Sequence, residues 1–310
     1  MPHRVLFFGS ASFSISLLEG LARDTRFEVI GVVTQPDRPV GRKGTLTPPP
    51  IKTAGINLGI KIFQYESVKL PEVIEKLKAL SPDLLIVASF GQIMPQALLD
   101  SAPRGAINFH WSLLPKYRGA SPIQAALING EEKTGATIML MDAKMDHGAI
   151  LAQFEEPISS DDTSDALYHR LGTLGAPLLA DTVINYIEGK ILPTKQDHSQ
   201  ATFVKLLSRD DGKLDPTLHT ATELERRVRA YQPWPGTFLE LQGKRLKVLN
   251  ASVGKMTNAA PGSTIEQDHF PAIICKDGSA LLLQEVQPEG KTPMSGGSFL
   301  QGQRSVFVKG

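Results

Sequence analysis

Short apolar runs alternate with segments of helical spacing over the first 190 residues of the chain. The apolar runs occupy residues 5–8, 29–34, 61–64, 84–89, 106–109 and 137–141. Between them, apolar residues recur at helical spacing, as at Ile15, Leu18 and Leu21, and a long helix is predicted over residues 164–187. Continuous apolar strands separated by helices are typical of a parallel sheet that is covered on both faces. The pattern therefore predicts an α/β domain with a mostly parallel sheet at residues 1–190.

The remainder of the chain has a different pattern. From about residue 192 it is polar and contains Pro193 and Pro216, a composition typical of a linker. A helix is predicted at residues 221–231, and short apolar runs follow at residues 238–241, 246–251, 272–275 and 281–286. Short strands joined by glycine-containing turns favour a small antiparallel barrel or sandwich. We therefore expect a linker at residues 191–206 and a smaller β-domain at residues 207–310.

The cysteine and charge content excludes several classes of protein. Cys275 is the only cysteine, which excludes an internal disulfide and a cysteine-based zinc site and indicates a reducing cytoplasm. No apolar stretch approaches the roughly 18 residues of a membrane span, so we expect no membrane partner. The net charge of +1 excludes a strongly basic nucleic-acid coat. Residues 191–310 still carry 15 Lys and Arg against 12 Asp and Glu, which is typical of a solvated face or of an anion-binding surface.

Ligands of parallel α/β sheets bind beyond the carboxyl ends of the strands, so the segments that follow the strands are informative. After the second strand, residues 35–50 form a loop rich in Pro and Gly, with basic residues at Arg38, Arg42 and Lys43. This loop is longer than the two to six residues usual after a strand. Its composition predicts a mobile segment.

Asn108 and His110 end the strand predicted at residues 106–109. Residues two apart on a strand point to the same face, so both side chains project together. An amide donor beside an imidazole can stabilise a developing oxyanion. The same pair is also consistent with a purely structural hydrogen bond.

Asp146 is the third candidate, in a glycine-containing turn after the strand at residues 137–141. Functional residues are common in such turns, although Asp142 and Asp146 also suit turn formation itself. A carboxylate beside a His and an Asn can remove a proton or orient an attacking group.

Other catalytic arrangements do not fit the sequence. Ser112 follows His110 but lacks the G-x-S-x-G nucleophile elbow. The histidines lack the i,i+4 spacing of zinc proteases, so no catalytic metal is expected. The turn at residues 9–13 lacks the three-glycine dinucleotide fingerprint, and we interpret it as a structural turn.

Two segments together resemble the signature of the folate-dependent formyltransferases. They are residues 108–123 (NFHWSLLPKYRGASPI) and residues 145–148 (MDHG). Residues 34–43 (TQPDRPVGRK) and 229–235 (RAYQPWP) resemble in particular the branch of this family that acts on methionyl-tRNA. The resemblance covers nearly the whole chain.

The resemblance implies transfer of a formyl group from 10-formyltetrahydrofolate to the α-amino group of methionine on initiator tRNA. It also implies a Rossmann-like catalytic domain and a C-terminal barrel of the oligonucleotide/oligosaccharide-binding (OB) type. By position, Asn108, His110 and Asp146 match the catalytic residues of the family. The positions implied to contact folate are Ser112, Leu113, Leu114 and Pro115, with Phe90, Gly91, Gln92 and Ile93 lining the same cleft. Arg42, next to Lys43, matches a basic loop residue associated with the tRNA acceptor end.

The residues and the resemblance lead to one mechanistic hypothesis. Asp146 accepts a proton from the methionine ammonium, directly or through a water, and helps to position His110. The neutral amine adds to the formyl carbon, while Asn108 and His110 stabilise the tetrahedral oxyanion. Tetrahydrofolate then leaves, and neither a metal nor a nucleotide is consumed.

Binding of tRNA requires contacts to phosphates, for which the second domain offers basic residues. The candidates are Arg226, Arg227, Arg229, Lys244, Arg245 and Lys247. We expect the partners to be initiator methionyl-tRNA and 10-formyltetrahydrofolate, and the protein to be a monomer.

Four alternative functions share parts of this pattern. One of them, a glycinamide ribonucleotide formyltransferase, would be shorter and lack the second domain. The nearest is a formyltransferase acting on an amino sugar nucleotide, against which the basic loop and residues 231–235 argue. A formyltetrahydrofolate hydrolase would use the same site with water as the acceptor. A non-catalytic RNA- or folate-binding protein would show no turnover.

Overall fold

The computed structural model describes residues 1–41, 44–241 and 243–302. By their contacts these residues form two compact units. The first comprises Met1–Pro122, Lys133–Pro157 and Ala166–Val204, and the second comprises Ile123–Glu132, Ile158–Asp165 and the chain from Lys205 onward. The domain boundaries at residues 190 and 206 stay a prediction.

A seven-stranded sheet forms the centre of the first unit, with the strand order β10-β9-β7-β6-β1-β2-β5. The strands are β1 (His3–Gly9), β2 (Phe27–Thr34), β5 (Ile62–Gln64), β6 (Leu84–Ala88), β7 (Ala106–His110), β9 (Lys133–Leu140) and β10 (Ile150–Pro157). The five strands from β5 to β7 pair in parallel, whereas β9 and β10 pair antiparallel at one edge. The predicted α/β fold with a mostly parallel sheet is therefore confirmed. A strand was predicted at residues 137–141, in the region of β9, but its antiparallel direction and the edge strand β10 were not predicted.

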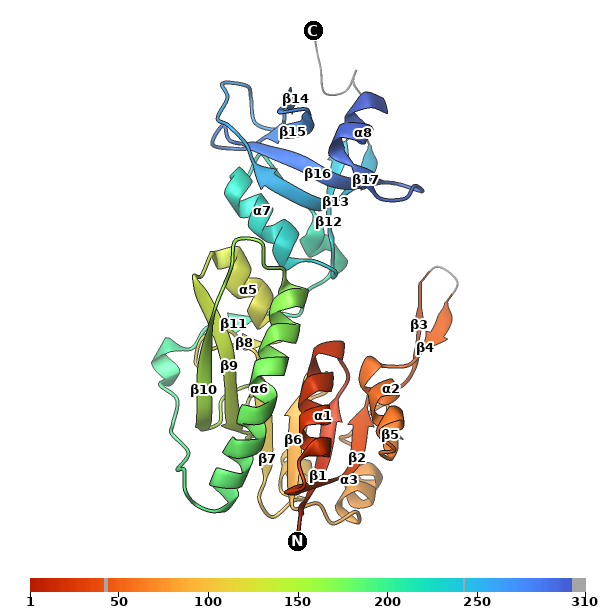
Figure 1. Ribbon diagram of the computed structural model, residues 1–310, viewed down its shortest axis with the longest axis vertical. Helices are drawn as coiled ribbons and strands as arrows, with labels where there is room; N and C mark the ends of the chain where they lie inside the picture. Colours follow the sequence, from red (N-terminus) through yellow and green to blue (C-terminus); the bar gives the residue numbers. More distant parts are fainter. Residues whose placement is uncertain (42–43, 242, 303–310) are drawn as a thin grey trace. The chain divides into compact units, whose positions relative to one another are not determined.

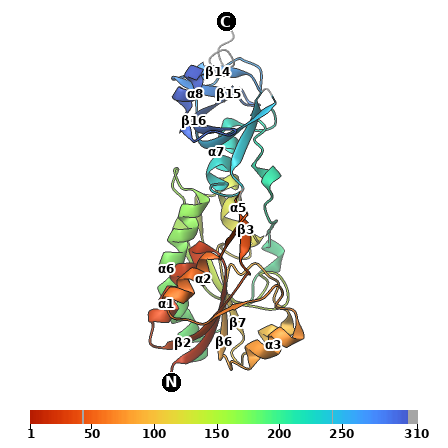
Figure 2. The same cartoon turned by 90° about the vertical axis from the view of Figure 1, so that its right-hand side faces the viewer.

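Helices cover both faces of this sheet (Figures 1 and 2). On one face lie α1 (Ile15–Arg23), α2 (Pro50–Asn57) and α6 (Ser164–Ile187), and on the other lies α3 (Pro71–Lys78). Close packing on the first face depends on glycine, because a Cβ at Gly175 of α6 would lie 2.4 Å from the ring of Phe109 in β7. On the second face, α3 and the short helix α4 (Gln96–Leu99) bury a core with the sheet that includes Phe8, Leu77 and Leu98.

The loop after β2 contains regular structure. Residues of β3 (Arg38–Val40) and β4 (Thr45–Thr47) pair as an antiparallel hairpin, and α2 begins directly after it at Pro50. Proline is well suited to a first helical position because its missing N–H has no intrahelical partner there. The hairpin and the helix start were not predicted, and the mobility of this loop stays a prediction for the described residues 35–41 and 44–50. Arg42 and Lys43 lie outside the described residues.

The second unit contains an antiparallel sheet, which confirms the coarse prediction for this part of the chain. Its strands are β12 (Thr237–Leu241), β13 (Lys244–Val253), β14 (Thr264–Gln267), β15 (Phe270–Ile274), β16 (Ala280–Pro288) and β17 (Met294–Ser295). The order is β12-β13-β16-β15-β14, with β17 also paired to β16. Two helices of this unit are α7 (Ala221–Ala230) and α8 (Gly296–Gly302). A closed barrel stays a prediction, because no pairing of β12 with β14 joins the ends of the sheet in the described residues.

The buried side of this sheet packs on α7. Leu224 and Val228 of α7 share a core with Leu246 and Val248 of β13. Helix α7 begins with a capping box, in which Thr220 Oγ1 accepts from the backbone N–H of Glu223 and the Glu223 carboxylate accepts from that of Thr220. Among the helices described, none is both long enough and apolar enough to cross a membrane.

Candidate active site

Asn108 and His110 lie on the last residues of β7, as the two-residue spacing predicts. Both side chains are buried, with exposed fractions of 8% and 6% for the residues. Parallel pairing with β6 on one side and antiparallel pairing with β9 on the other fix this strand in the sheet. The two polar side chains are therefore held on a rigid element, which suits a site that needs precise geometry.

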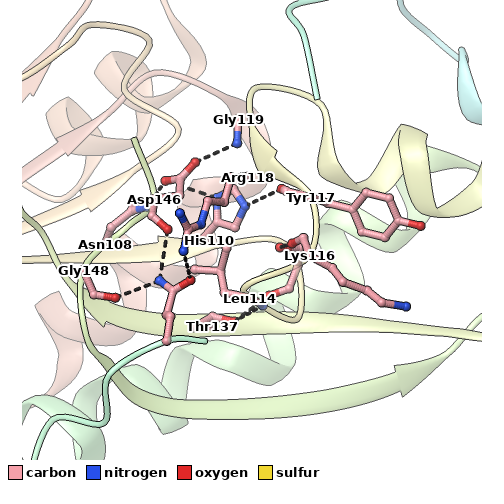
Figure 3. A network of polar contacts seen from close by, with 12 residues as sticks. Asn108, His110, Leu114, Lys116, Tyr117, Arg118, Gly119, Thr137, Asp146 and Gly148 are labelled. Carbon is pink, nitrogen blue, oxygen red and sulfur yellow. Dashed lines mark hydrogen bonds and ion pairs between the residues drawn. The ribbon is translucent and has the colours of Figure 1, made fainter. Parts of the chain in front are cut away.

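Asp146 reaches these residues by a different path from the one predicted. Strand β9 runs antiparallel to β7, with Leu140 opposite Ile107, so β9 ends beside the start of β7. The turn that follows brings Asp146 Oδ1 to 3.4 Å from Asn108 Nδ2 and to 3.7 Å from His110 Nδ1. Figure 3 shows the three side chains together. The structure thus brings Asn108, His110 and Asp146 into one site.

The segment that contains β8 (Arg118–Gly119) positions the groups of this site. The backbone N–H of Gly119 donates to Asp146 Oδ2 at 2.7 Å, and His110 Nε2 lies 3.0 Å from the carbonyl oxygen of Tyr117 (Figure 3). A carbonyl oxygen can only accept, so His110 Nε2 carries a hydrogen and donates it. In the neutral ring, Nδ1 is then an acceptor that faces a carboxylate oxygen at 3.7 Å, too far for a hydrogen bond.

A proton donor placed between His110 Nδ1 and Asp146 Oδ1 would satisfy both acceptors. An ammonium group or a water has the required hydrogens. The side chain of Asp146 is 14% exposed, so the carboxylate is accessible from outside the protein. This arrangement can accept a proton from an incoming amine.

The positions implied to contact folate differ in what they leave available to a ligand. Ser112 and Leu114 are buried, and Thr137 Oγ1 connects them by donating to Ser112 O at 2.6 Å and accepting from Leu114 N at 3.1 Å. The Ser112 hydroxyl donates to Lys116 O. Leu113 and Pro115, between and beside them, are half-buried.

Residues 90–93, the second segment implied to contact folate, likewise include both buried and exposed positions. Phe90 is buried and packs edge-on against Phe8 at 5.3 Å. The Gln92 side chain is engaged at both ends, donating to Tyr65 O and accepting from Val68 N. Gly91 and Ile93 are exposed, so within this segment they are the residues free to line a cleft.

The residues predicted to bind tRNA are placed in different environments. Arg42 and Lys43 lie outside the described residues. Lys244, Arg245 and Lys247 are exposed on β13. Arg226 is half-buried, with its guanidinium against Gly130, and Arg227 Nη2 lies 2.8 Å from His219 Nε2. Arg229 is paired with Glu225 at 2.6 Å and donates to Asp162 O, so its guanidinium is engaged within the protein.

Three further residues around Asp146 had no assigned role in the sequence analysis. Gln196, Arg118 and His198 form a chain of contacts: Arg118 Nη2 lies 2.7 Å from Gln196 Oε1 and 2.8 Å from His198 Nδ1. Arg118 stands in the segment that carries the family resemblance, but nothing in the sequence indicated its partners. Gln196 and His198 lie in the polar segment interpreted as a linker, where composition alone gives no sign of burial.

His198 continues this chain of contacts toward solvent. Its ring stacks on that of His147, with centroids 3.9 Å apart, and His147 Nδ1 pairs with Asp142 at 2.6 Å. Desolvation lowers the pKa of His198, and the positive charges of His147, Arg118 and Lys144 lower it further, while Asp142 opposes them. Within the part of the chain that the structure describes, no group of three or more His, Cys, Asp or Glu side chains can hold a metal ion.

Comparisons with family models and with individual proteins identify the same family. A model described as formyl transferase matches residues 3–183, and one described as the formyl transferase C-terminal domain matches residues 206–304. The methionyl-tRNA formyltransferase of Roseiflexus sp. (strain RS-1) is 43% identical over 306 residues, which cover 98% of this chain and 94% of that protein. That of Bacillus subtilis (strain 168) is 43% identical over 301 residues, covering 96% of this chain and 94% of that protein.

Among solved structures, HypX from Aquifex aeolicus in complex with tetrahydrofolic acid has a similar fold. The TM-score is 0.66 at 17% sequence identity, and the match covers 97% of this chain and 47% of that one. At this identity the likeness concerns the fold alone.

Proposed function

Since this chain belongs to the formyltransferase family, in the branch that acts on methionyl-tRNA, we propose that Asn108, His110 and Asp146 carry out its reaction. That reaction is the formylation of methionine on initiator tRNA, which starts translation. The observation that carries the proposal is the convergence of the three side chains, with Asn108 Nδ2 at 3.4 Å and His110 Nδ1 at 3.7 Å from Asp146 Oδ1. The alternative of an amino sugar nucleotide as acceptor is less supported by relatives of this identity.

The formyl donor in this proposal is 10-formyltetrahydrofolate. The surface groups next to the site fit such a ligand, since Leu113, Pro115, Gly91 and Ile93 offer apolar and backbone surface that is not fully buried. The buried members of the same segments, Phe90 and Leu114 among them, would support this surface from below. Pockets for flat organic ligands are commonly lined in this way, by apolar residues with a few polar groups.

Proton removal is assigned to Asp146. The amino group of an aminoacyl ester is partly protonated near neutral pH and must be neutral to attack. An ammonium hydrogen directed between Asp146 Oδ1 and His110 Nδ1 meets two acceptors that lack a donor between them. The carboxylate is held in place by the N–H of Gly119, so it receives the proton without reorienting.

Stabilisation of the tetrahedral oxyanion is assigned to Asn108 and His110. One hydrogen of the Asn108 amide points to Asp146 at 3.4 Å, and the second remains for the oxyanion. The ammonium proton stays on Asp146. His110 becomes a donor at Nδ1 when it takes up the second proton, which the attacking nitrogen releases after it has bonded to the formyl carbon, because Nε2 is already committed to Tyr117 O. Donors that are positioned before the reaction stabilise developing charge strongly.

The exposed basic residues of β13 are proposed to contact phosphates of the tRNA. Arg245 and Lys247 lie two residues apart and so share one face of the strand, while Leu246 and Val248 point into the core. Antiparallel strands with a basic outer face are compatible with the finer prediction of an OB-type barrel. The proposed location of the protein is the cytoplasm, where translation starts.

The test is formyl transfer from 10-formyltetrahydrofolate to initiator and to elongator methionyl-tRNA, followed by radiolabel in the tRNA. We expect rapid transfer to the initiator, with Asn108→Ala and His110→Ala each slowing turnover by about 10²–10³-fold. Turnover that remains nearly intact in both variants would overturn the assignment of the residues. Folate turnover on an amino sugar nucleotide, without transfer to either tRNA, would instead move the acceptor to the alternative class.

A further inference from the structure

Gln196 is buried beside the turn that carries Asp146. Its side-chain amide donates to two backbone carbonyls of this turn, Asp146 O at 3.0 Å and Gly148 O at 2.7 Å. The residue is 6% exposed, so water does not replace these bonds readily. One side chain therefore holds the backbone on both sides of His147.

The turn needs such support because its backbone is constrained at Asp146 and at Gly148. Asp146 has a φ of +47°, in the left-handed region that residues other than glycine rarely adopt. At Gly148, a Cβ would lie 1.8 Å from the carbonyl oxygen of Leu140, so only glycine fits this approach to β9. A non-glycine residue in this region persists when the surrounding structure fixes it.

The orientation of the Gln196 amide is itself determined by Arg118. A guanidinium only donates, so the atom 2.7 Å from Arg118 Nη2 must be the amide oxygen. Carbonyls only accept, so the other end must be the NH₂ group. Glutamine thus suits this position because its NH₂ group donates to the two carbonyls and its oxygen accepts from Arg118.

These contacts close a loop around the catalytic carboxylate. Arg118 precedes Gly119, whose N–H holds Asp146 Oδ2, and Arg118 itself holds Gln196, which holds the Asp146 backbone. The side chain and the main chain of Asp146 are therefore fixed by one segment, β8, the side chain directly through Gly119 and the main chain through Gln196.

We propose that Gln196 is a positioning residue for the formyl transfer, which keeps the Asp146 carboxylate directed at the acceptor amine. The inference rests on the proposed role of Asp146. The Gln196 side chain contacts Arg118 and the backbone of the turn, so it acts through Asp146, and its removal is expected to affect turnover rather than substrate binding.

The segment around Gln196 is attached to the first unit at other points as well. Thr194 and Ile150 exchange backbone hydrogen bonds of 2.8 Å, and β11 (Phe203–Val204) pairs in parallel with β8. The segment is therefore expected to remain in place when the Gln196 side chain is changed. This makes a positioning role separable from a general loss of structure.

Two substitutions of similar size test the proposal in the full-length protein. Gln196→Glu keeps the contact to Arg118 but places an acceptor against the carbonyls of Asp146 and Gly148, and Gln196→Met removes both functions. We expect each to lower kcat by about 10- to 100-fold, the size of effect known for loss of the hydrogen-bond partners that orient metal ligands. KM for methionyl-tRNA and for 10-formyltetrahydrofolate should stay within about twofold. The matched control is Gln200→Glu, the same change at an exposed position four residues further on.

The pH profile gives a readout that a merely structural role would not move. In Gln196→Glu the added carboxylate brings negative charge next to the site, so the acid limb of the kcat profile should move to higher pH. In Gln196→Met the limb should also shift, because Asp146 loses its fixed geometry toward Gly119. If both variants fold, as judged by their melting temperatures, and keep kcat within twofold with an unchanged profile, the proposal is wrong.

Asp146→Asn distinguishes this failure from failure of the proposed site. If Asp146→Asn retains turnover, the proposed role of Asp146 is wrong, and the inference about Gln196 is then wrong as well. If Asp146→Asn abolishes turnover while both Gln196 variants remain active, only the inference falls.

Discussion

The backbone N–H of Gly119 donates a hydrogen bond of 2.7 Å to Asp146 Oδ2 and so connects β8 to the proposed catalytic carboxylate. Gly119 has a φ of +113°, and a Cβ at this position would lie 2.2 Å from the carbonyl oxygen of Val204 in β11. Backbone pairing between β8 and β11 thus leaves no space for a side chain here. The orientation of the Asp146 carboxylate therefore depends on Gly119 having no side chain.

Gly119→Ala is therefore expected to displace β8 from β11 and to move the N–H away from Asp146. We expect kcat to fall at least about tenfold and the free energy of unfolding to fall by about 1–3 kcal/mol, as is typical for strain of this kind. Denaturant unfolding and formyl transfer measure the two effects. Gly189→Ala is the control, since its φ of +71° carries a similar backbone cost but a Cβ there meets nothing within 4 Å. Activity that is equal in both variants would contradict the role of the Gly119 amide.

The contact between Arg118 and His198 predicts a dependence of stability on pH. His198 Nδ1 accepts from Arg118 Nη2, so the ring must be neutral, and desolvation together with nearby positive charge lowers its pKa below 6.5 in the folded state. The unfolded chain then binds more protons than the folded one between these two pKa values. The contribution of the Arg118–His198 hydrogen bond to stability is complete above about pH 6.5. It is lost as the pH falls from there toward the pKa of His198 in the folded state.

His198→Asn tests this prediction, because the Asn oxygen can accept from Arg118 at every pH. We expect the melting temperature of the natural protein to fall more steeply between pH 7 and pH 5 than that of the variant. Equal slopes for both proteins would show that His198 does not contribute.

The base of the β3–β4 hairpin provides a further prediction. Lys52 Nζ lies 2.8 Å from both carboxylate oxygens of Asp37, and Gln64 Nε2 donates to the same carboxylate at 2.7 Å. The hydrogen bonds from Lys52 and then Gln64 lower the pKa of Asp37, so it is charged at neutral pH. Asp37→Asn weakens this attachment. Because the family resemblance associates Arg42, in the same loop, with the tRNA acceptor end, KM for methionyl-tRNA should rise several-fold while KM for 10-formyltetrahydrofolate is unchanged.

Glu66→Gln is the matched control for the hairpin. Glu66 pairs with Arg38 of β3, but both side chains are more than half exposed, and exposed pairs contribute little. A rise in KM for methionyl-tRNA that is as large in Glu66→Gln as in Asp37→Asn would contradict a specific role of the half-buried contact between Asp37 and Lys52. Steady-state kinetics at fixed ionic strength make the comparison.

Much of the first unit was predictable because its strands are short, apolar and separated by helical patterns. Asn108 and His110 were placed by the two-residue period of a strand alone. Asp146 lies beside them, as predicted, but the reason for this prediction is wrong. It was expected at the carboxyl end of a parallel strand, but β9 is antiparallel, and the following turn carries Asp146 back to β7.

Gln196 and the hairpin show what sequence patterns miss. A buried glutamine in a polar segment has no periodicity, and its partners lie about 50 and 78 residues away in the chain. The hairpin has three-residue strands, all exposed, so no apolar alternation marks it. Both features depend on long-range polar contacts, which local propensity does not encode.

The basic face of β13 gives a prediction about tRNA binding. Glu240 of β12 pairs in register with Arg245, and it remains charged because a hydrogen bond from Lys213 lowers its pKa. Lys247→Ala is expected to weaken binding of initiator tRNA and to reduce the slope of log Kd against log salt by about one, as for loss of one phosphate contact. Glu240→Gln should have the opposite effect, since it removes a negative charge beside Arg245 and releases Lys213.

Filter binding of initiator tRNA over a range of salt concentrations measures both changes. Lys255→Ala is the control, because Lys255 is an exposed lysine of the same unit whose ammonium pairs with Asp268 at 3.6 Å. If Lys247→Ala and Lys255→Ala leave the slope equally unchanged, β13 does not contact phosphate. If Lys247→Ala alone reduces the slope and Glu240→Gln strengthens binding, the charge on this strand contributes directly to the affinity for tRNA.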